Sequence, residues 1–118
     1  MMRNFDSDCI FCKIAQGEIP SEIVYQDEKV TAFKDLSPKA PVHVLIIPNG
    51  HYSDLNDCGE EDAEWMGQVL LTAARIAREQ GIGESGYRVI VNAGPDAGQT
   101  VFHLHYHLLG GKPMAFTV

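Results

Sequence analysis

The feature of this 118-residue chain that most constrains its fold is a run near the C-terminus in which histidine alternates with hydrophobic residues. Residues 103–107 read His-Leu-His-Tyr-His and hold three of the five histidines of the chain. Successive side chains of a β-strand point to opposite faces, so the alternation predicts a strand over residues 101–109 with all three imidazoles on one face. A buried strand face ordinarily carries Val, Ile or Leu, and adjacent imidazoles need partners when neutral and repel one another when charged. We therefore expect these histidines to form a chemical site.

The remaining sequence predicts one long helix and a set of shorter elements. Apolar residues recur at helical spacing over residues 60–80, with acidic residues at the start and Gly81 beyond the end. Asp57 and Glu60 have the spacing of a capping box for this helix. A short helical turn is expected over residues 9–16. Further strands are expected at residues 23–26, 29–36, 43–48 and 87–92. This order predicts an α+β fold with an antiparallel sheet of about five strands and helices on one face.

Length and charge limit the classes of protein to which the chain can belong. A chain of 118 residues is expected to form a single domain, residues 1–118. The net charge of −7 argues against binding polymeric nucleic acid, because such binding needs many Lys and Arg side chains. One small nucleotide can still bind, because a few hydrogen-bond donors close to it suffice for its phosphate. No apolar run is long enough to span a membrane, and the polar N-terminus lacks the pattern of a secretory signal. We expect a soluble, cytoplasmic protein that binds neither polymeric nucleic acid nor a membrane.

Two kinds of chemistry fit the spacing of the histidines: a metal site, and a histidine nucleophile flanked by helpers. A metal site needs a carboxylate or a further histidine nearby, whereas a nucleophile needs amide and hydroxyl donors aimed at a phosphate. Asn92, Gln99 and Thr100 stand shortly before the run, and Gly94 and Gly98 would let the backbone approach a ligand. These neighbours favour the nucleophile.

Two of the three cysteines point to a separate site. Cys9 and Cys12 stand in one predicted helical turn, a spacing that favours a metal or free thiols over a structural disulfide. The alternative is that both are buried apolar residues of a short helix. Cys58 stands apart from the pair and has no predicted role.

The run from His103 to Leu109 resembles the signature of the histidine-triad (HIT) family. The similarity extends to Ile10-Phe11, residues 32–38, Ala40-Pro41, His43, Val91-Asn92 and residues 98–100, which together span nearly the whole chain. Leu109-Gly110-Gly111 is similar to the Hint branch of purine nucleoside phosphoramidases, rather than the Fhit branch of dinucleoside polyphosphate hydrolases. The resemblance implies a hydrolase that cleaves the P–N bond of adenosine or guanosine 5′-phosphoramidates, giving a nucleoside monophosphate and an amine.

The resemblance also implies roles for the residues around the phosphate. His105 would be the nucleophile that forms a nucleotidyl-histidine intermediate, and a neutral imidazole is a competent nucleophile near pH 7. His107 would contact a phosphate oxygen, while Gln99 and Thr100 would bind the phosphate and the leaving group. Thr100 stands where family members usually carry serine, which adds a methyl group beside the leaving group. The residues expected to orient the histidines are Asn92 and His43.

The base and ribose would be held by a second set of residues. Asp35 matches the acidic position that contacts the ribose hydroxyls in the family, although from the residues alone a turn-capping role before Ser37-Pro38 is preferred. The apolar walls around the purine correspond to Ile10, Phe11, Ile14, Ile19, Phe33 and Leu36.

The resemblance completes the metal site with two histidines. Some bacterial members bind structural zinc through two such cysteines, a histidine in the position of His51 and the first triad histidine. The implied ligands are Cys9, Cys12, His51 and His103. No organic cofactor is expected.

The resemblance further implies a homodimer in which the long helix and a strand edge pair across a two-fold axis. The C-terminus would reach the partner's site, where Met114 and Phe116 could contact substrate. Two other functions fit the same residues. One is hydrolysis of dinucleoside polyphosphates, and the other is a zinc-stabilised nucleotide-binding or scaffold protein with vestigial activity.

Overall fold

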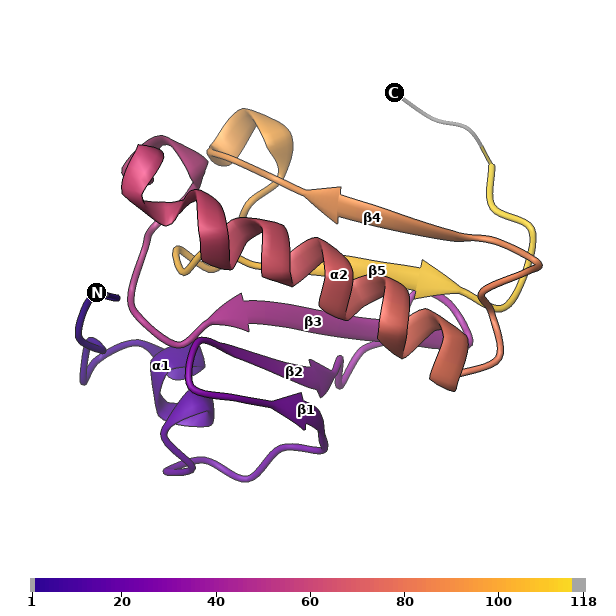
Figure 1. Cartoon of the computed structure of the whole chain (residues 1–118), viewed down its shortest axis with the longest axis horizontal. Helices are drawn as coiled ribbons and strands as arrows, with labels where there is room; N and C mark the ends of the chain where they lie inside the picture. The colour runs from indigo at the N-terminus through magenta and orange to yellow at the C-terminus, as the bar shows by residue number, and fades with distance from the viewer. Residues whose placement is uncertain (1, 116–118) are drawn as a thin grey trace.

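The computed structural model describes residues 2–115, which form one five-stranded antiparallel sheet with two α-helices (Figure 1). The sheet order is β1-β2-β3-β5-β4. The strands are β1 (Ile23–Gln26), β2 (Val30–Lys34), β3 (Val42–Pro48), β4 (Tyr87–Val91) and β5 (Tyr106–Gly110). The helices are α1 (Ile10–Ala15) and α2 (Ala63–Glu79), with 3₁₀ turns η1 (Leu55–Asp57), η2 (Glu60–Asp62) and η3 (Pro95–Ala97). The predicted α+β class and sheet are confirmed. Among these residues no helix is long and apolar enough to cross a membrane.

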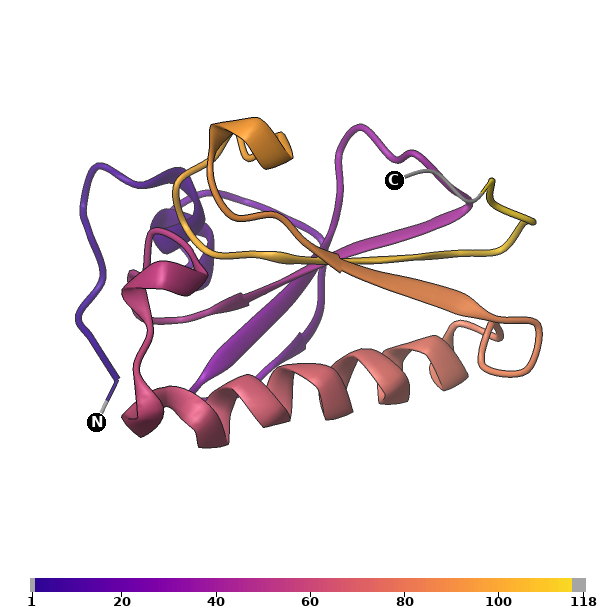
Figure 2. The same cartoon turned by 90° about the horizontal axis from the view of Figure 1, so that it is seen from above.

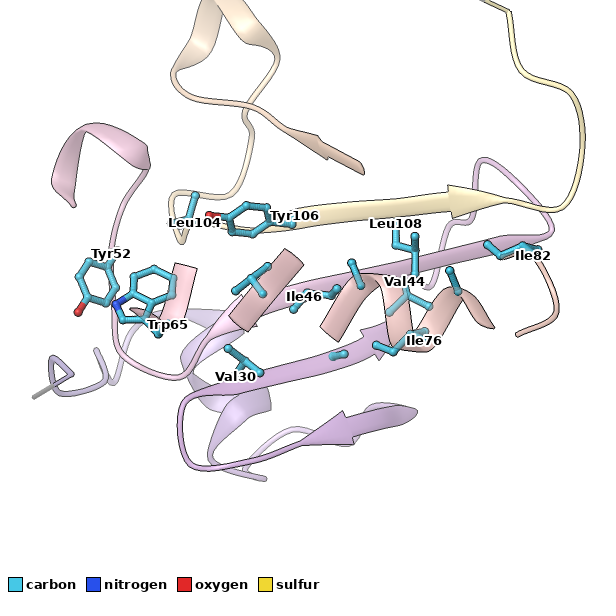
Figure 3. Packing of buried hydrophobic residues seen from close by; sticks show 14 residues of the cluster. Val30, Val44, Ile46, Tyr52, Trp65, Ile76, Ile82, Leu104, Tyr106 and Leu108 are labelled. Atoms are coloured by element: carbon cyan, nitrogen blue, oxygen red, sulfur yellow. The ribbon is translucent and has the colours of Figure 1, made fainter. Parts of the chain in front are cut away.

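Helix α2 covers one face of the sheet and buries the main core (Figures 2 and 3). Its apolar stripe repeats every three to four residues, which places the stripe on the side facing the strands. Trp65, Val69 and Ile76 are at most 4% exposed and pack against Val44 and Ile46 of β3. Burying side chains of this size stabilises the fold by about 1.5–3 kcal/mol each. Because α2 occupies this face, the opposite face is left for α1 and the loops that follow β3 and β4, so the prediction that the helices lie on one face is wrong.

The start of α2 differs from the prediction. The α-helix begins at Ala63 after the turn η2, three residues later than expected. The predicted capping box between Asp57 and Glu60 is wrong, because Asp62 accepts the Gly59 N–H at 2.9 Å instead. The other end follows the prediction, since Gly81 has a φ of 78° and closes the helix in the left-handed region.

The histidine run also differs, because β5 begins at Tyr106 and residues 101–105 are not strand. The predicted strand over 101–109 is therefore too long at its start. The last β3–β5 pair joins Ile46 to Tyr106, and continued pairing would place Pro48 opposite Leu104. Proline has no N–H for the ladder. The Leu104 N–H donates instead to the Tyr52 carbonyl at 2.7 Å, outside the sheet.

The alternation of side chains survives this departure. Leu104, Tyr106 and Leu108 are buried in the core under α2. His103 and His105 lie on the other side, where both rings contact Phe11 of α1 edge-on, with centroids 6.0 and 5.3 Å away. The alternation thus predicted correctly which side chains lie on which face of the sheet, although the strand is shorter than predicted.

Candidate active site and metal centre

His105 lies beside α1 with its ring orientation fixed by the backbone. Its Nδ1 is 2.8 Å from the carbonyl oxygen of His103. A carbonyl only accepts, so Nδ1 of the neutral ring must carry the proton and Nε2 must hold the lone pair. The residue is 7% exposed, and Phe11 packs against the ring. In the neutral ring this arrangement leaves Nε2 of His105 as the nitrogen without a proton.

His43 and His107 form a chain of hydrogen bonds, the relay, beside the ring of His105. The backbone N–H of Lys39 donates to His43 Nδ1 at 3.0 Å, which places the His43 proton on Nε2. That Nε2–H lies 3.0 Å from His107 Nδ1 and therefore donates to it. The His107 proton must then stand on Nε2. The ring centroids of His107 and His105 are 5.0 Å apart.

Burial keeps both of these helper histidines neutral. It lowers the pKa of His107 from 6.5 to about 4, with smaller contributions from His105 and His43. Burial also lowers the pKa of His43, although the Asp35 carboxylate opposes that shift. At pH 7 both rings therefore act as neutral hydrogen-bonding groups.

Asp35 lies beside His43, at the solvent-exposed side of the relay. Its Oδ1 accepts the Ser37 N–H at 2.7 Å, which is the turn-capping contact expected from the residues alone. Its Oδ2 is 3.4 Å from His43 Nε2, and its side chain is 20% exposed. A cleft of about 410 Å³ opens here, with Asn92 and His107 also in its lining. The cleft is where a ligand can meet the relay.

The amide and hydroxyl donors predicted near the phosphate differ in availability. Gln99 is buried; its Nε2 donates to the Ser53 carbonyl at 2.7 Å, and its Oε1 accepts the Gly94 N–H at 2.8 Å. Asn92 donates to the Ala97 carbonyl at 2.9 Å and lines the cleft. Thr100 is exposed. In this structure Gln99 thus braces the loop, whereas the other two side chains are accessible.

The predicted apolar walls separate into two groups. Phe11, Ile14 and Phe33 are buried together in a second, smaller core, with Ile19 packed at its edge. Ile10 is 50% exposed and Leu36 is 91% exposed. Phe116 lies outside the described residues, and Met114 is half-buried.

The four predicted metal ligands converge beside α1. Cys9 caps the helix, and its Sγ lies 3.3 Å from His103 Nδ1. Cys12 Sγ lies 3.4 Å from both His103 Nδ1 and His51 Nδ1. A tetrahedral zinc ion with Zn–S of 2.3 Å and Zn–N of 2.0–2.1 Å requires S···N separations of about 3.5 Å. The four donor atoms lie within 4.8 Å of one another, so they fit zinc.

Hydrogen bonding directs the lone pair of His103 toward the thiols. Its Nε2 lies 2.9 Å from the Pro48 carbonyl, so Nε2 carries the proton and Nδ1 is free to ligate. Burial lowers the pKa of His103 to about 4, which keeps the ring neutral as a ligand must be. Burial raises the pKa of Cys12 to about 11, so the metal-free site holds a thiol that binding must deprotonate.

A second group of possible ligands, Asp35, His43 and His107, also has donor atoms within 4.8 Å of one another. The Lys39 N–H already occupies Nδ1 of His43, so a metal on Nε2 would leave that ring without a proton. His43 and His107 are therefore hydrogen-bonded to each other rather than arranged as ligands, with Asp35 Oδ2 3.4 Å from His43 Nε2.

Backbone atoms supply contacts that sequence reasoning missed. The Lys39 N–H, the Pro48 carbonyl and the His103 carbonyl each fix a histidine tautomer. Every residue offers a carbonyl and nearly every residue an N–H, so no residue type could have marked these positions.

Comparison with known proteins identifies the family. The HIT domain model matches residues 16–114. The chain belongs to the HIT domain family. It is 51% identical over 107 residues to the purine nucleoside phosphoramidase of Escherichia coli K12, covering 91% of this chain and 90% of that protein. It is 48% identical over 111 residues to the 14 kDa zinc-binding protein of Zea mays, covering 92% of this chain and 86% of that protein.

Solved structures agree. A histidine triad protein from Clostridium difficile superposes with a TM-score of 0.92 and 47% identity, covering 96% of this HIT chain and 98% of that one. A HIT family hydrolase from Clostridium thermocellum gives a TM-score of 0.92 and 50% identity, with coverage of 96% and 98%. The predicted family, its fold and the expectation of an enzyme are confirmed.

Proposed function

We propose that this HIT protein hydrolyses purine nucleoside 5′-phosphoramidates through a covalent intermediate on His105. The observation that carries the proposal is the hydrogen bond from His105 Nδ1–H to the His103 carbonyl, which leaves Nε2 as a free nucleophile. The name of the Escherichia coli relative supports the substrate class.

The reaction has two displacements at phosphorus. In the first, the Nε2 lone pair of His105 attacks the α-phosphorus, and the electron pair of the P–N bond leaves with the amine nitrogen, which takes up a proton from solvent. In the second, a water oxygen attacks the nucleotidyl-histidine and gives its proton to solvent, while the P–N bond to His105 breaks; this releases the nucleoside monophosphate and restores the lone pair of His105. The Nε2–H of His107 stabilises charge on a phosphate oxygen, because the relay from His43 fixes that proton outward.

Asp35 and the exposed apolar residues would hold the nucleoside. Each carboxylate oxygen can accept two hydrogen bonds, so Asp35 retains acceptor sites for ribose hydroxyls beside its bond to the Ser37 N–H. Ile10 and Leu36 expose apolar surface that a purine would cover. Asn92 and Thr100 would contact the phosphate or the leaving group, and Gln99, bonded to the Ser53 carbonyl, would hold their loop.

We propose that zinc occupies the Cys9, Cys12, His51 and His103 site in a structural role. Four protein ligands would complete a tetrahedral shell and would leave no open position for substrate. Bound zinc supplies folding free energy, because the unfolded chain holds no preformed site. The name of the Zea mays relative supports the metal.

We further propose a cytoplasmic homodimer. Strand β4 is an edge of the sheet, and Leu70 and Leu71 on α2 are 54% and 65% exposed. An unpaired edge and an apolar helix surface are the features that pairing across a two-fold axis would cover.

The experiment traps the intermediate. Rapid acid quenching with a labelled, slowly hydrolysed phosphoramidate should leave label on the wild-type protein and none on His105→Gly. The His105→Ala variant should lose more than about 100-fold in kcat, since general acid–base help alone is worth roughly 10²–10⁴, while binding adenosine monophosphate within about tenfold of wild type.

The outcomes separate the candidate functions. A His105→Ala protein that kept more than about a hundredth of wild-type kcat, with its zinc content unchanged, would overturn the nucleophile assignment. Faster turnover of diadenosine tetraphosphate than of adenosine phosphoramidate would instead favour a dinucleoside polyphosphate hydrolase.

A further inference from the structure

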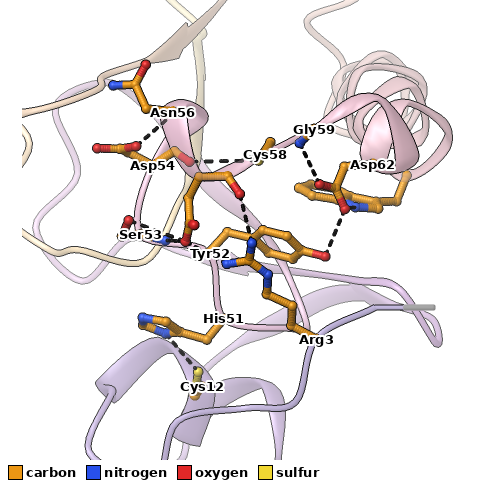
Figure 4. Close-up of polar contacts among 12 residues, drawn as sticks. Arg3, Cys12, His51, Tyr52, Ser53, Asp54, Asn56, Cys58, Gly59 and Asp62 are labelled. Atoms are coloured by element: carbon orange, nitrogen blue, oxygen red, sulfur yellow. Dashed lines mark hydrogen bonds and ion pairs between the residues drawn. The ribbon is translucent and has the colours of Figure 1, made fainter.

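The N-terminal arm, residues 2–6, lies across the loop that carries His51 (Figure 4). Arg3 anchors it: Nη1 lies 2.7 Å from Asp57 Oδ2, and Nη2 donates to the Asp57 carbonyl at 3.0 Å. The guanidinium also stacks on the ring of Tyr52, 4.6 Å from its centroid. With 47% of the Arg3 side chain exposed, this ion pair adds little to global stability. Its effect is to fix where the arm runs.

Two hydrogen bonds connect this arm to the metal ligands. The His51 N–H donates to the Asn4 carbonyl at 3.2 Å. The Asp6 N–H donates to Cys12 Sγ at 3.2 Å. Cys12 and His51 are 39 residues apart, on α1 and on the loop after β3, so sheet pairing does not hold them together. The arm therefore ties two ligands from separate parts of the chain.

Gly50 shows how closely the arm is seated. A Cβ at this position would lie 2.5 Å from the Arg3 carbonyl oxygen and 2.6 Å from Met2 Cγ. Gly50 is not among the glycines with positive φ, so the requirement is for space and not for backbone conformation. The arm can therefore lie against residue 50, next to His51, only because glycine has no side chain.

Tyr52 gives the arm a rigid support. Its ring is 1% exposed, and its hydroxyl donates to Asp62 Oδ1 at 2.9 Å at the start of α2. The same carboxylate oxygen accepts the indole N–H of Trp65 at 2.9 Å. The surface on which Arg3 stacks is therefore part of the main core.

We propose that the arm is a positioning element of the metal centre, holding the His51 backbone and the Cys12 thiol in their ligating arrangement and so slowing the release of zinc. The inference rests on the proposed zinc site. Partners that orient metal ligands typically change metal affinity 10- to 100-fold when removed.

The test uses the zinc-loaded full chain and a chromogenic chelator. Arg3→Ala should release zinc about tenfold faster than wild type, and amide exchange at His51 should accelerate in parallel. Arg75→Ala is the matched control, because Arg75 stacks 4.3 Å from the centroid of Tyr25, pairs with Glu79 and is 48% exposed. It lies on α2, away from the ligands, and should release zinc within about twofold of wild type.

Gly50→Ala displaces the arm in a second way and should also release zinc faster than wild type. The melting temperatures of the metal-free variants show whether a substitution destabilises the fold itself. Faster release by Arg3→Ala, with a metal-free melting temperature equal to that of Arg75→Ala, supports the proposal. Equal release rates for Arg3→Ala and Arg75→Ala overturn it. Wild-type zinc content is measured first. Less than one zinc per two chains would refute the zinc site itself, and the role of the arm with it.

Discussion

Replacing His43 should show whether the hydrogen bond from His43 to His107 contributes to catalysis. In His43→Ala the part-buried Nδ1 of His107 loses the N–H donor that lies 3.0 Å away. Leaving a buried acceptor without a partner costs about 1–3 kcal/mol. If the cost falls on the transition state, kcat drops about 5- to 150-fold, since each 1.36 kcal/mol is a factor of ten. KM should change little, because the bond is internal to the protein.

His43→Gln is the informative control. A glutamine amide can place an N–H donor near the position of the lost Nε2–H, so this variant should keep kcat within about fivefold of wild type. Steady-state kinetics on adenosine phosphoramidate measure both variants, and ¹⁵N spectra of the imidazoles report the His107 tautomer. Equal loss of kcat in the alanine and glutamine variants would mean that the ring of His43 matters for packing and that the relay has no catalytic effect.

Three further outcomes are expected. Protein purified with zinc available should contain about one zinc per chain, and chelation should lower its melting temperature, because metal bound only by the native state adds to stability; an unchanged melting temperature would argue against the site. Asp35→Ala should raise KM about tenfold through lost hydrogen bonds to a charged acceptor, with kcat largely retained; the converse pattern would remove Asp35 from ribose binding. The depressed pKa of His107, about 4 against 6.5, means that the unfolded chain takes up the proton first on acidification. The stability that neutral His107 contributes is therefore complete above pH 6.5 and is lost as the pH falls toward 4, with about 2 kcal/mol gone by pH 5. The free energy of urea unfolding should depend less on pH in His107→Gln than in wild type. The same dependence on pH in both proteins would contradict the depressed pKa of His107.

The sequence predicted those parts of the fold that depend on periodic side-chain burial. The stripe of α2 and the alternation of the histidine run both follow from repeating geometry, so the faces of Trp65 and His105 were predictable. The extent of β5 was not, because it depends on Pro48 of β3, with which Leu104 would have to pair. Such a contact between distant segments has no local periodicity.

The candidate site divides along similar lines. Residue type and resemblance placed four metal ligands that the structure brings together. They did not show that the amide of Gln99 is taken up by the Ser53 carbonyl, nor that Asp57 pairs with Arg3 rather than capping α2. In each case a polar side chain had two suitable partners, and packing of distant segments selected between them.

His103 contributes its ring to the thiols and its carbonyl oxygen to His105, so one residue serves two sites through chemically independent atoms. The carbonyl belongs to the main chain, and every amino acid supplies it. No substitution at position 103 can therefore delete the acceptor that sets the tautomer of His105, and only a change in the course of the backbone can withdraw it. The reactive state of His105 is robust to mutation at its nearest partner, and its vulnerability lies in whatever holds the peptide group of residue 103 in place.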